Sequence, residues 1–212
     1  MVTILASKSP RRAKILADHG WKFQVEPTEA EEVSIPRAPR RTVLVNAARK
    51  LKACRARHPD ARIIAADTIV WFDGCIYGKP RDLDEARQFL RELSGQTHSV
   101  FTGVAYCRPG ERLETEVVES RVTFRKLSEA LIDRYVETVR PIDRAGAYDI
   151  DESGDLIVAS YTGSYENIMG LPLDEVLKSG KVEKWKGGKV EKGENVANVK
   201  VLPIPNVANA QL

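Results

Sequence analysis

The chain has 212 residues, of which 42% are hydrophobic and 30% are charged, and its formal net charge is +3. This composition is typical of a globular protein and allows one large α/β domain or two small lobes around a cleft. The small net charge gives no reason to expect a nucleic-acid partner, and no apolar run is long enough to cross a membrane or to act as a signal peptide. Three widely spaced cysteines indicate neither a disulfide framework nor a zinc site, so we expect a cytoplasmic protein.

The first element in chain order is a strand, followed by a polar turn and a helix. Residues 2–6 form a short apolar run, and a helical pattern begins after Ser9 and Pro10 and ends near residue 20. Serine favours the N-cap position and proline the first helical position. The turn thus places hydroxyl groups and two arginines, Arg11 and Arg12, at a helix N-terminus, which suits a phosphate group. A capped helix with solvated basic residues would have the same pattern.

Strands and helices then alternate as far as residue 177. We expect further strands over residues 21–26, 62–72, 75–77, 98–107, 113–124 and 156–161, and helices over residues 42–58, from Asp82 or Asp84 to 93, from Ser128 to 136 and over 174–177. This order predicts an α/β fold with a mixed or parallel twisted sheet, flanking helices and ligands at the strand ends. Residues 1–177 would form this domain, and the polar residues 178–212 a flexible tail.

One carboxylate lies inside the most apolar strand of the chain. Asp67 is flanked by alanines on one side and by Thr68, Ile69 and Val70 on the other. Burial of an unpaired carboxylate is costly, so Asp67 must be paired, hydrogen-bonded or bound to a metal. Carboxylates in such surroundings gather at active sites, although an aspartate at a sheet edge could also simply face the solvent.

Other charged residues occur where a polyphosphate site would need them. Lys79 stands between a glycine and a proline after a hairpin, Lys50 lies on a predicted helix, and an acidic loop over residues 27–40 holds Glu29, Glu31 and Glu32. Cations together with oxygen ligands for a hard metal suit a polyphosphate substrate. Each of these residues taken alone could be an ordinary surface charge. The phosphate-loop motif of the P-loop enzymes is not in the sequence.

A set of short motifs gives a more specific indication. The run Leu-Ala-Ser-Lys-Ser-Pro-Arg-Arg at residues 5–12 is similar to the opening signature of the Maf family of nucleotide pyrophosphatases. The resemblance continues in order through residues 66–68, 78–80, 93–96, 102–104, 122–124, 145–148, 163–165 and 170–173. Each motif is weak by itself, but the ordered set covers residues 2–177 and is specific.

The resemblance implies an α/β fold of two lobes around a deep cleft, related to the inosine triphosphate pyrophosphatases. It also implies hydrolysis of a nucleoside triphosphate to the monophosphate and pyrophosphate, with Mg²⁺ or Mn²⁺ as cofactor. The family is associated with cleaning of the nucleotide pool and with arrest of septum formation. The expected partner is thus the nucleotide, without nucleic acid or membrane, and a homodimer is left open.

The resemblance also assigns roles to single residues. Asp67 matches the proton acceptor of the family and, with Glu32, the metal site. The residues that match phosphate contacts are Ser7, Arg11, Arg12, Lys50 and Lys79. These residue types suit the reaction, since attack of water on the α-phosphorus needs a base, and the pyrophosphate leaving group needs positive charge.

Three positions separate the branches of the family by substrate. Arg11 and Thr68 agree with the branch that acts on dTTP and UTP, whereas the branch that acts on 7-methyl-GTP has an aromatic residue and glutamine there. The third position aligns with Asp151, which fits neither branch, because an ionised aspartate only accepts hydrogen bonds. We expect pyrimidine triphosphates as substrates. A pyrophosphatase for 7-methyl-GTP or other modified nucleotides, and a nucleotide-binding regulator of cell division, are the alternatives.

Overall fold

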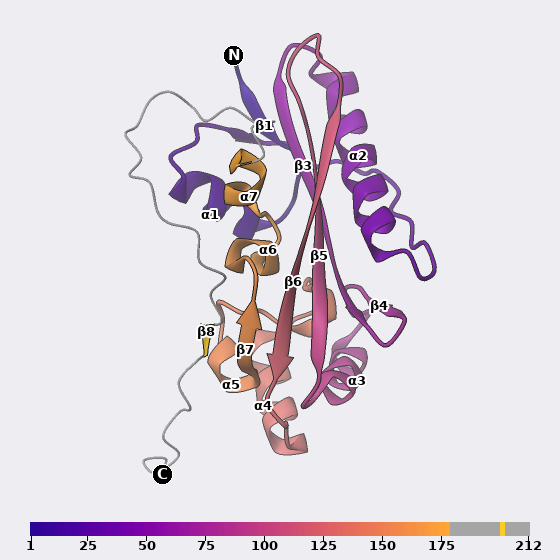
Figure 1. Cartoon of the computed structure of the whole chain (residues 1–212), viewed down its shortest axis with the longest axis vertical. Coiled ribbons are helices and arrows are strands. Elements are labelled where there is room, and N and C mark those ends of the chain that lie inside the picture. The colour runs from indigo at the N-terminus through magenta and orange to yellow at the C-terminus, as the bar shows by residue number, and fades with distance from the viewer. Residues whose placement is uncertain (179–199, 202–212) are drawn as a thin grey trace.

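The protein is built on one twisted sheet. The computed structural model describes residues 1–178 and 200–201 (Figure 1). The strands are β1 (Thr3–Leu5), β2 (Gln24–Val25), β3 (Arg62–Phe72), β4 (Cys75–Tyr77), β5 (Thr97–Cys107), β6 (Glu114–Phe124), β7 (Val158–Thr162) and β8 (Lys200–Val201). Their order in the sheet is β2-β1-β3-β5-β6-β7-β8, with β4 paired to β3.

The sheet is mixed, as predicted. β1 runs parallel to β2 and to β3, whereas β3, β5, β6, β7 and β8 follow one another in antiparallel pairs. The register places Asp67 opposite Gly103 of β5. Because β3, β5 and β6 each extend over 11 residues, they are long enough to run from one end of the molecule to the other (Figure 1).

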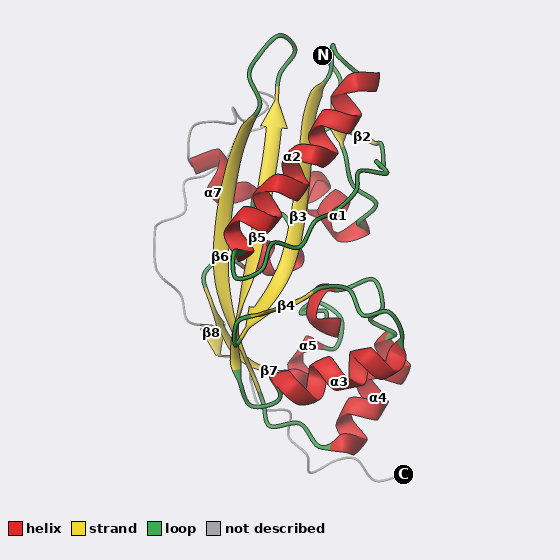
Figure 2. Cartoon of the chain, turned by 90° about the vertical axis from the view of Figure 1, so that its right-hand side faces the viewer, coloured by secondary structure: helices red, strands yellow, loops and turns green. Residues whose placement is uncertain are grey.

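The helices lie on both faces and at one end of these long strands. The helices are α1 (Pro10–Asp18), α2 (Pro39–Arg57), α3 (Leu83–Leu93), α4 (Glu129–Val139), the 3₁₀ helix η1 (Ala145–Ala147), α5 (Gly154–Ile157), α6 (Tyr165–Met169) and α7 (Leu173–Lys178). Figures 1 and 2 show α2 on one face of the sheet and α1, α6 and α7 on the other, while α3, α4 and α5 gather at the lower end. The predicted two-lobed α/β architecture is confirmed.

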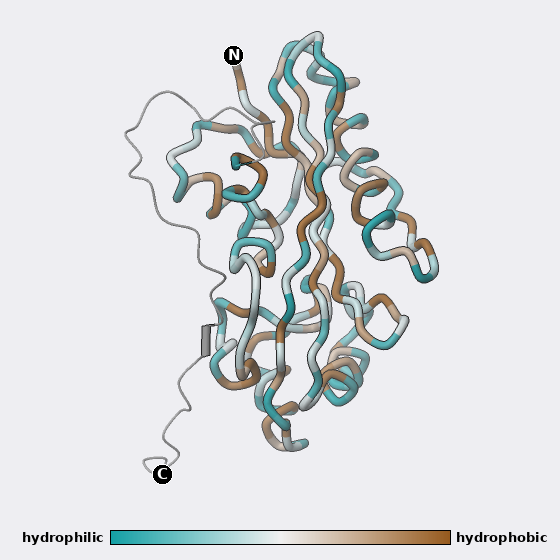
Figure 3. Tube along the Cα trace, viewed as in Figure 1, coloured by the Kyte–Doolittle hydropathy of each residue, from teal (hydrophilic) through white to brown (hydrophobic). Residues whose placement is uncertain are grey.

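The alternation of side chains along β3 divides the core between the two faces of the sheet. Ile63 and Ala65 pack with Leu51 of α2, whereas Ile64 and Ala66 belong to the larger cluster that includes α1, α3 and α4. Figure 3 shows hydrophobic stretches along the central strands and mixed stretches in the surrounding helices. No helix within residues 1–178 is long and apolar enough to cross a membrane.

Local sequence signals explain most of the helix boundaries. The side chain of Asp82 accepts a hydrogen bond from the N–H of Glu85, and Ser128 caps α4 in the same way through Leu131. Ser9 occupies the N-cap position of α1, but its side chain makes no capping bond. The prediction that Ser9 begins the helix is therefore correct in place but not in mechanism.

Two helical segments differ from the prediction. Residues 156 and 157, expected at the start of a strand, end the short helix α5, and the strand begins at Val158. The helix α6 was not predicted, because five residues are too few for a helical repeat to show. In the predicted tail, residues 200–201 pair with β7 as β8, and residues 179–199 and 202–212 lie outside the described residues.

A glycine allows α2 to lie directly on the sheet. A Cβ atom at Gly103 would stand 2.5 Å from the backbone oxygen of Val43 in α2. A backbone contact this short cannot be relieved by a side-chain rotation. Gly103 therefore fixes the distance between α2 and β5, and with it the depth at which α2 presents its side chains beside β3.

We expect Gly103→Ala to lower the free energy of unfolding by about 1–3 kcal/mol, since the added methyl group must push α2 away from the sheet. Urea unfolding monitored by circular dichroism measures this change. The matched control is Gly78→Ala, where a Cβ atom meets nothing within 4 Å. An equal loss of stability in both variants would contradict the close approach.

Candidate active site

The principal cleft lies where β3 is uncovered along one edge. β1 pairs with β3 only as far as Ile64, and β4 begins to pair at Val70. Between them, residues 65–69 have β5 on one edge and, within the described chain, no strand on the other. A cleft of about 470 Å³ opens here, lined by residues 6–12, parts of the 28–32 and 143–150 loops, Lys50, Thr68, Val70, Lys79, Val100 and residues 168–170.

The strand alternation places the predicted base and the neighbouring threonine on opposite faces of β3. Asp67 continues the series of Ile63 and Ala65, so its side chain turns toward α2, and the side chain is only 8% exposed. Thr68 turns to the other face, where its hydroxyl lies 2.9 Å from that of Thr102 and 3.0 Å from a guanidinium nitrogen of Arg12. The open edge of β3 therefore joins two distinct polar clusters.

Two residues of α2 hold the carboxylate of Asp67. Lys50 Nζ donates to Asp67 Oδ1 at 2.7 Å, and Asn46 Nδ2 donates to Asp67 Oδ2 at 3.0 Å. The two donors stand one helical turn apart on α2, so they face β3 together. Both carboxylate oxygens thus have a donor and keep lone pairs for a further partner.

The same ammonium group connects Asp67 to the acidic loop. Lys50 Nζ lies 2.6 Å from Glu32 Oε1, so it bridges two carboxylates. Burial raises the pKa of Glu32, but the hydrogen bond and charge of Lys50 and the charges of Lys79 and Arg12 outweigh it and hold the pKa below its usual value. Two carboxylates that face one cation are a suitable ligand set for a hard divalent metal, which these oxygens would hold if it took the place of the ammonium.

Arg12 has a role that the sequence did not indicate. Its Nε donates to the carbonyl oxygen of Gly170 at 2.8 Å, and Nη1 donates to Ala66 O at 2.9 Å and to Ser7 Oγ at 3.1 Å. Its Nη2 donates to Thr68. Burial lowers the pKa of Arg12, with Asp67 acting in the opposite direction. Arg12 therefore donates hydrogen bonds to the backbone and side chain of residues at the open edge of β3. Through these bonds it connects β3 to α1 and to the end of α6.

Ser7 is also occupied by the protein itself. Its hydroxyl accepts hydrogen bonds from the backbone N–H of Ser9 at 3.2 Å and from Arg12. Ser7 lines the cleft together with Lys8, which pairs with Glu29 at 2.7 Å where both side chains are exposed. The turn before α1 thus has the predicted composition. In this structure, however, the hydroxyl of Ser7 and the guanidinium of Arg12 bond to the protein itself and hold the turn in place.

Arg11 reaches across the cleft to a carboxylate on the other side. Arg11 Nη1 donates to Asp149 Oδ2 at 3.1 Å, and Arg144 Nε donates to the same oxygen at 2.9 Å. Burial raises the pKa of Asp149, but the bonds from Arg144 and from the N–H of Asp151 and the charges of both arginines outweigh it and lower the pKa. The ionised Asp149 therefore orients Arg11. Asp149 is itself held in place by α4, because its backbone N–H donates a hydrogen bond to the hydroxyl of Tyr135.

Lys79 differs from the other cations of the cleft. It lies on the loop after β4, is exposed, and makes no ion pair with any residue in the described part of the chain. Its charge lowers the pKa of Glu32, and Lys79, Glu32 and Lys50 all line the cleft. Lys79 is therefore the cation that a bound anion can contact without displacing a partner.

The third specificity position does not line the cleft. Asp151 is exposed, and its carboxylate accepts a hydrogen bond from Tyr165 at 3.1 Å. The cleft is lined instead by Tyr148, Asp149 and Ile150. Asp149 and Asn46 are the site residues that the sequence analysis missed. The signal for Asn46 was its spacing of four from Lys50, whereas Asp149 could be recognised only from its tertiary partners.

A buried histidine supports the wall of the cleft behind Tyr148. His98 Nε2 lies 3.0 Å from the hydroxyl of Tyr148, and the imidazole packs edge-on against the rings of Phe124 and Tyr148. Its Nδ1 has no hydrogen-bond partner among the described residues. Burial lowers the pKa of His98 from 6.5 to about 3, so the ring is neutral at physiological pH.

The sequence of the chain is similar to that of one family of proteins. Residues 3–180 match the family described as Maf-like protein. A dTTP/UTP pyrophosphatase of Akkermansia muciniphila is 43% identical over 178 residues, which cover 82% of this chain and 93% of that protein. One of Latilactobacillus sakei is 41% identical over 176 residues, covering 82% and 97%. The solved Ham1 protein of Staphylococcus aureus is 12% identical, with a TM-score of 0.45 over 59% of this chain and 73% of that one.

We expect Arg12→Lys to lower the free energy of unfolding of the ligand-free protein by about 2–4 kcal/mol, because lysine keeps the charge but cannot bond to β3 and α6 together. Arg11→Lys, at the neighbouring position with one partner, should cost at most about 1 kcal/mol. Chemical denaturation of both variants gives the comparison. If Arg12 were only a phosphate contact, its substitution would leave this stability unchanged.

A second prediction concerns pH. Because the folded pKa of His98 is lowered, the unfolded chain takes up the proton first, and stability falls as the pH drops from about 6.5 toward 3. Between pH 6 and 4, the free energy of unfolding of His98→Gln should fall less steeply than that of the wild type, by about 1.4 kcal/mol per pH unit. Equal slopes in the wild type and in His98→Gln would contradict a neutral, buried His98.

Proposed function

Since the chain belongs to the Maf-like protein family, we propose that it is a nucleoside triphosphate pyrophosphatase that acts on dTTP and UTP. The observation that supports this most is the buried carboxylate of Asp67 at the open edge of β3, beside a cleft lined by Arg11, Lys50 and Lys79. A carboxylate next to several cations suits the activation of water beside a bound polyphosphate.

In the proposed reaction, Asp67 accepts a proton from the attacking water while the water oxygen bonds to the α-phosphorus. The bond from the α-phosphorus to the bridging oxygen breaks, and pyrophosphate leaves with the electron pair of that bond. Lys79, which has no ion pair within the described residues, would contact the phosphates directly. Arg11, oriented by Asp149, would contact the nucleotide from the other side of the cleft.

Glu32 and Asp67 are the residues that would hold a divalent cation such as Mg²⁺ or Mn²⁺. Their oxygens already face one cationic group, the ammonium of Lys50, which supports the fit. When bound, the cation would supply positive charge to the phosphate oxygens. Ser7 and Arg12 would act by keeping the turn before α1 and the edge of β3 in place, since both are already hydrogen-bonded to each other and to backbone groups.

Two features of the site concern which nucleobase of the substrate is preferred. Arg11 and Thr68 agree with the pyrimidine branch, and the relatives from Akkermansia muciniphila and Latilactobacillus sakei are named dTTP/UTP pyrophosphatases. Asp151 departs from that branch but is exposed and bonded to Tyr165 outside the cleft lining. We therefore propose that the charge at Asp151 does not change the preference for pyrimidine triphosphates.

The test is the release of pyrophosphate from a panel of nucleoside triphosphates with Mg²⁺. We expect dTTP and UTP to be the best substrates. Asp67→Asn should lower kcat by about 10²–10⁴-fold, because the amide cannot accept the proton, while the nucleotide still binds. Binding is measured separately by calorimetry with the inactive variant.

The matched control for this substitution is Asp73→Asn in the turn that follows the same strand. Asp73 is exposed and lies outside the cleft lining, so its variant should keep full activity. No pyrophosphate from any nucleotide would contradict the proposed activity, and a preference for 7-methyl-GTP would contradict the proposed substrates. Full activity of Asp67→Asn would contradict the role of Asp67 as the general base.

A further inference from the structure

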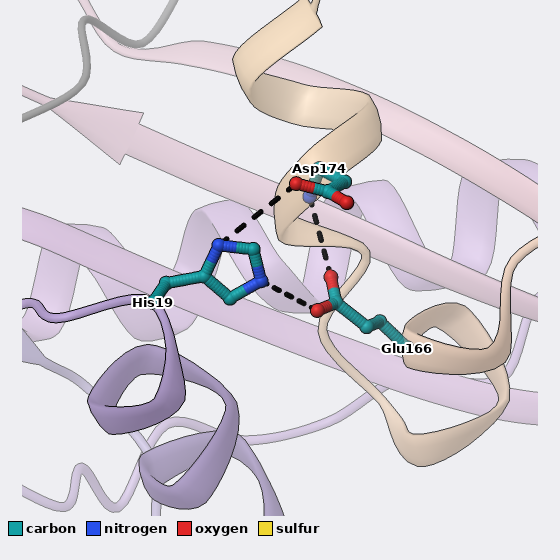
Figure 4. Close-up of side chains that lie close together, drawn as sticks. All are labelled: His19, Glu166 and Asp174. Carbon is teal, nitrogen blue, oxygen red and sulfur yellow. Dashed lines mark hydrogen bonds and ion pairs between the residues drawn. The ribbon is translucent and has the colours of Figure 1, made fainter. Parts of the chain in front are cut away.

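A second group of metal-ligating side chains lies outside the cleft. His19 follows the end of α1, Glu166 belongs to α6, and Asp174 belongs to the first turn of α7 (Figure 4). His19 Nε2 lies 2.5 Å from Glu166 Oε1, and His19 Nδ1 lies 3.8 Å from Asp174 Oδ1. None of the three residues lines the cleft.

We propose that His19, Glu166 and Asp174 form a binding site for one divalent transition-metal ion of the Zn²⁺ class. Each residue offers one ligand atom, and these atoms all lie within 4.8 Å of one another. An imidazole nitrogen with two carboxylate oxygens is a ligand set that zinc accepts, with a fourth position left to solvent. The imidazole separates this site from the all-oxygen environment that Mg²⁺ prefers.

The distances fit a metal after small movements of side chains. Zinc binds histidine nitrogen at about 2.0–2.1 Å and carboxylate oxygen at about 2.0–2.2 Å, so an ion can bind two atoms that are 3.8 Å apart. Glu166 already reaches both partners, since its other oxygen accepts a hydrogen bond from the backbone N–H of Asp174 at 3.3 Å. A rotation of Glu166 would complete the site.

The charge balance around these residues also favours a cation. Glu166 and Asp174 are two carboxylates with one shared histidine, and within residues 1–178 neither pairs with a lysine or an arginine. A neutral His19 leaves two negative charges uncompensated, and a protonated one leaves a single charge. A divalent ion would neutralise both carboxylates. Asp174, whose side chain is 55% exposed, provides a path from the solvent.

A metal ion at this site would connect α1 to α7 and to α6, which ends at the cleft. α1 carries Arg12, and α6 ends at Gly170, whose carbonyl oxygen accepts the hydrogen bond from Arg12 Nε. The three ligands connect the far end of α1 to α6 and α7. A bound ion would therefore stabilise the folded protein without taking part in the reaction.

The experiment is calorimetric titration of the metal-free protein with Zn²⁺ alone, without nucleotide. We expect the wild type to bind one more ion per chain than His19→Gln, or to bind it at least about tenfold more tightly, the size of effect seen even for outer-shell changes at metal sites. Zn²⁺ should also raise the thermal unfolding midpoint of the wild type more than that of the variant. Ions held by Glu32 and Asp67 contribute equally to both proteins, so the difference isolates the new site.

His58→Gln is the matched control, because His58 Nε2 also lies 3.8 Å from a carboxylate oxygen, that of Glu26, but no second carboxylate pairs with it in the described chain. This variant should bind Zn²⁺ as the wild type does. Glu166→Gln keeps the size of the side chain but removes its negative charge and one acceptor oxygen, and it replaces His19→Gln if that variant does not fold. Equal binding by the wild type, His19→Gln and Glu166→Gln would overturn the proposal, as would an equal loss in His58→Gln.

Discussion

The site depends on the unequal lengths of three strands. β1 stops at Leu5, which is opposite Ile64 of β3, and the antiparallel β4 stops at Tyr77, which is opposite Val70, so within the described chain β3 continues alone on this edge between these two positions. Backbone groups along this edge of β3 would need partners, and Arg12 supplies one for the carbonyl oxygen of Ala66. The interruption of the sheet gives side chains from both faces access to one cleft. The alternation of side chains along β3 then places Asp67 and Thr68 on opposite faces of the sheet beside this edge.

Most charged side chains of the cleft are paired before any ligand binds, and Lys79 is the exception among the described residues. Lys50 lies between Asp67 and Glu32, and Arg11 shares Asp149 with Arg144. Apart from Glu32, these side chains are mostly removed from solvent, where an unpaired charge would be costly. In the proposed function, a polyphosphate would therefore exchange partners with Lys50 and Arg11, while Lys79 could contact it directly. These internal ion pairs stabilise the cations in the ligand-free protein, and the same cations are then present to bind a ligand with several negative charges.

The sequence predicted the parts of the site that depend on local pattern. The apolar run of β3 defined that strand over residues 62–72, and a charge inside it identified Asp67. The role of Arg12 was not predictable, because its partners lie at residues 7, 66, 68 and 170 and meet only through the fold. Asp149 was missed for the same reason. The ordered motifs identified the family, but a motif does not show whether an arginine binds a ligand or the protein.

In the proposed function, the reacting phosphate lies beside Asp67 at the open edge of β3. A crystal structure of Asp67→Asn with dTTP would show whether it does. We expect the α-phosphate next to residue 67, the β- and γ-phosphates toward Lys79, and the nucleobase on the side of Arg11 and Asp149. Triphosphate density around Arg144, with the base against residue 67, would contradict it.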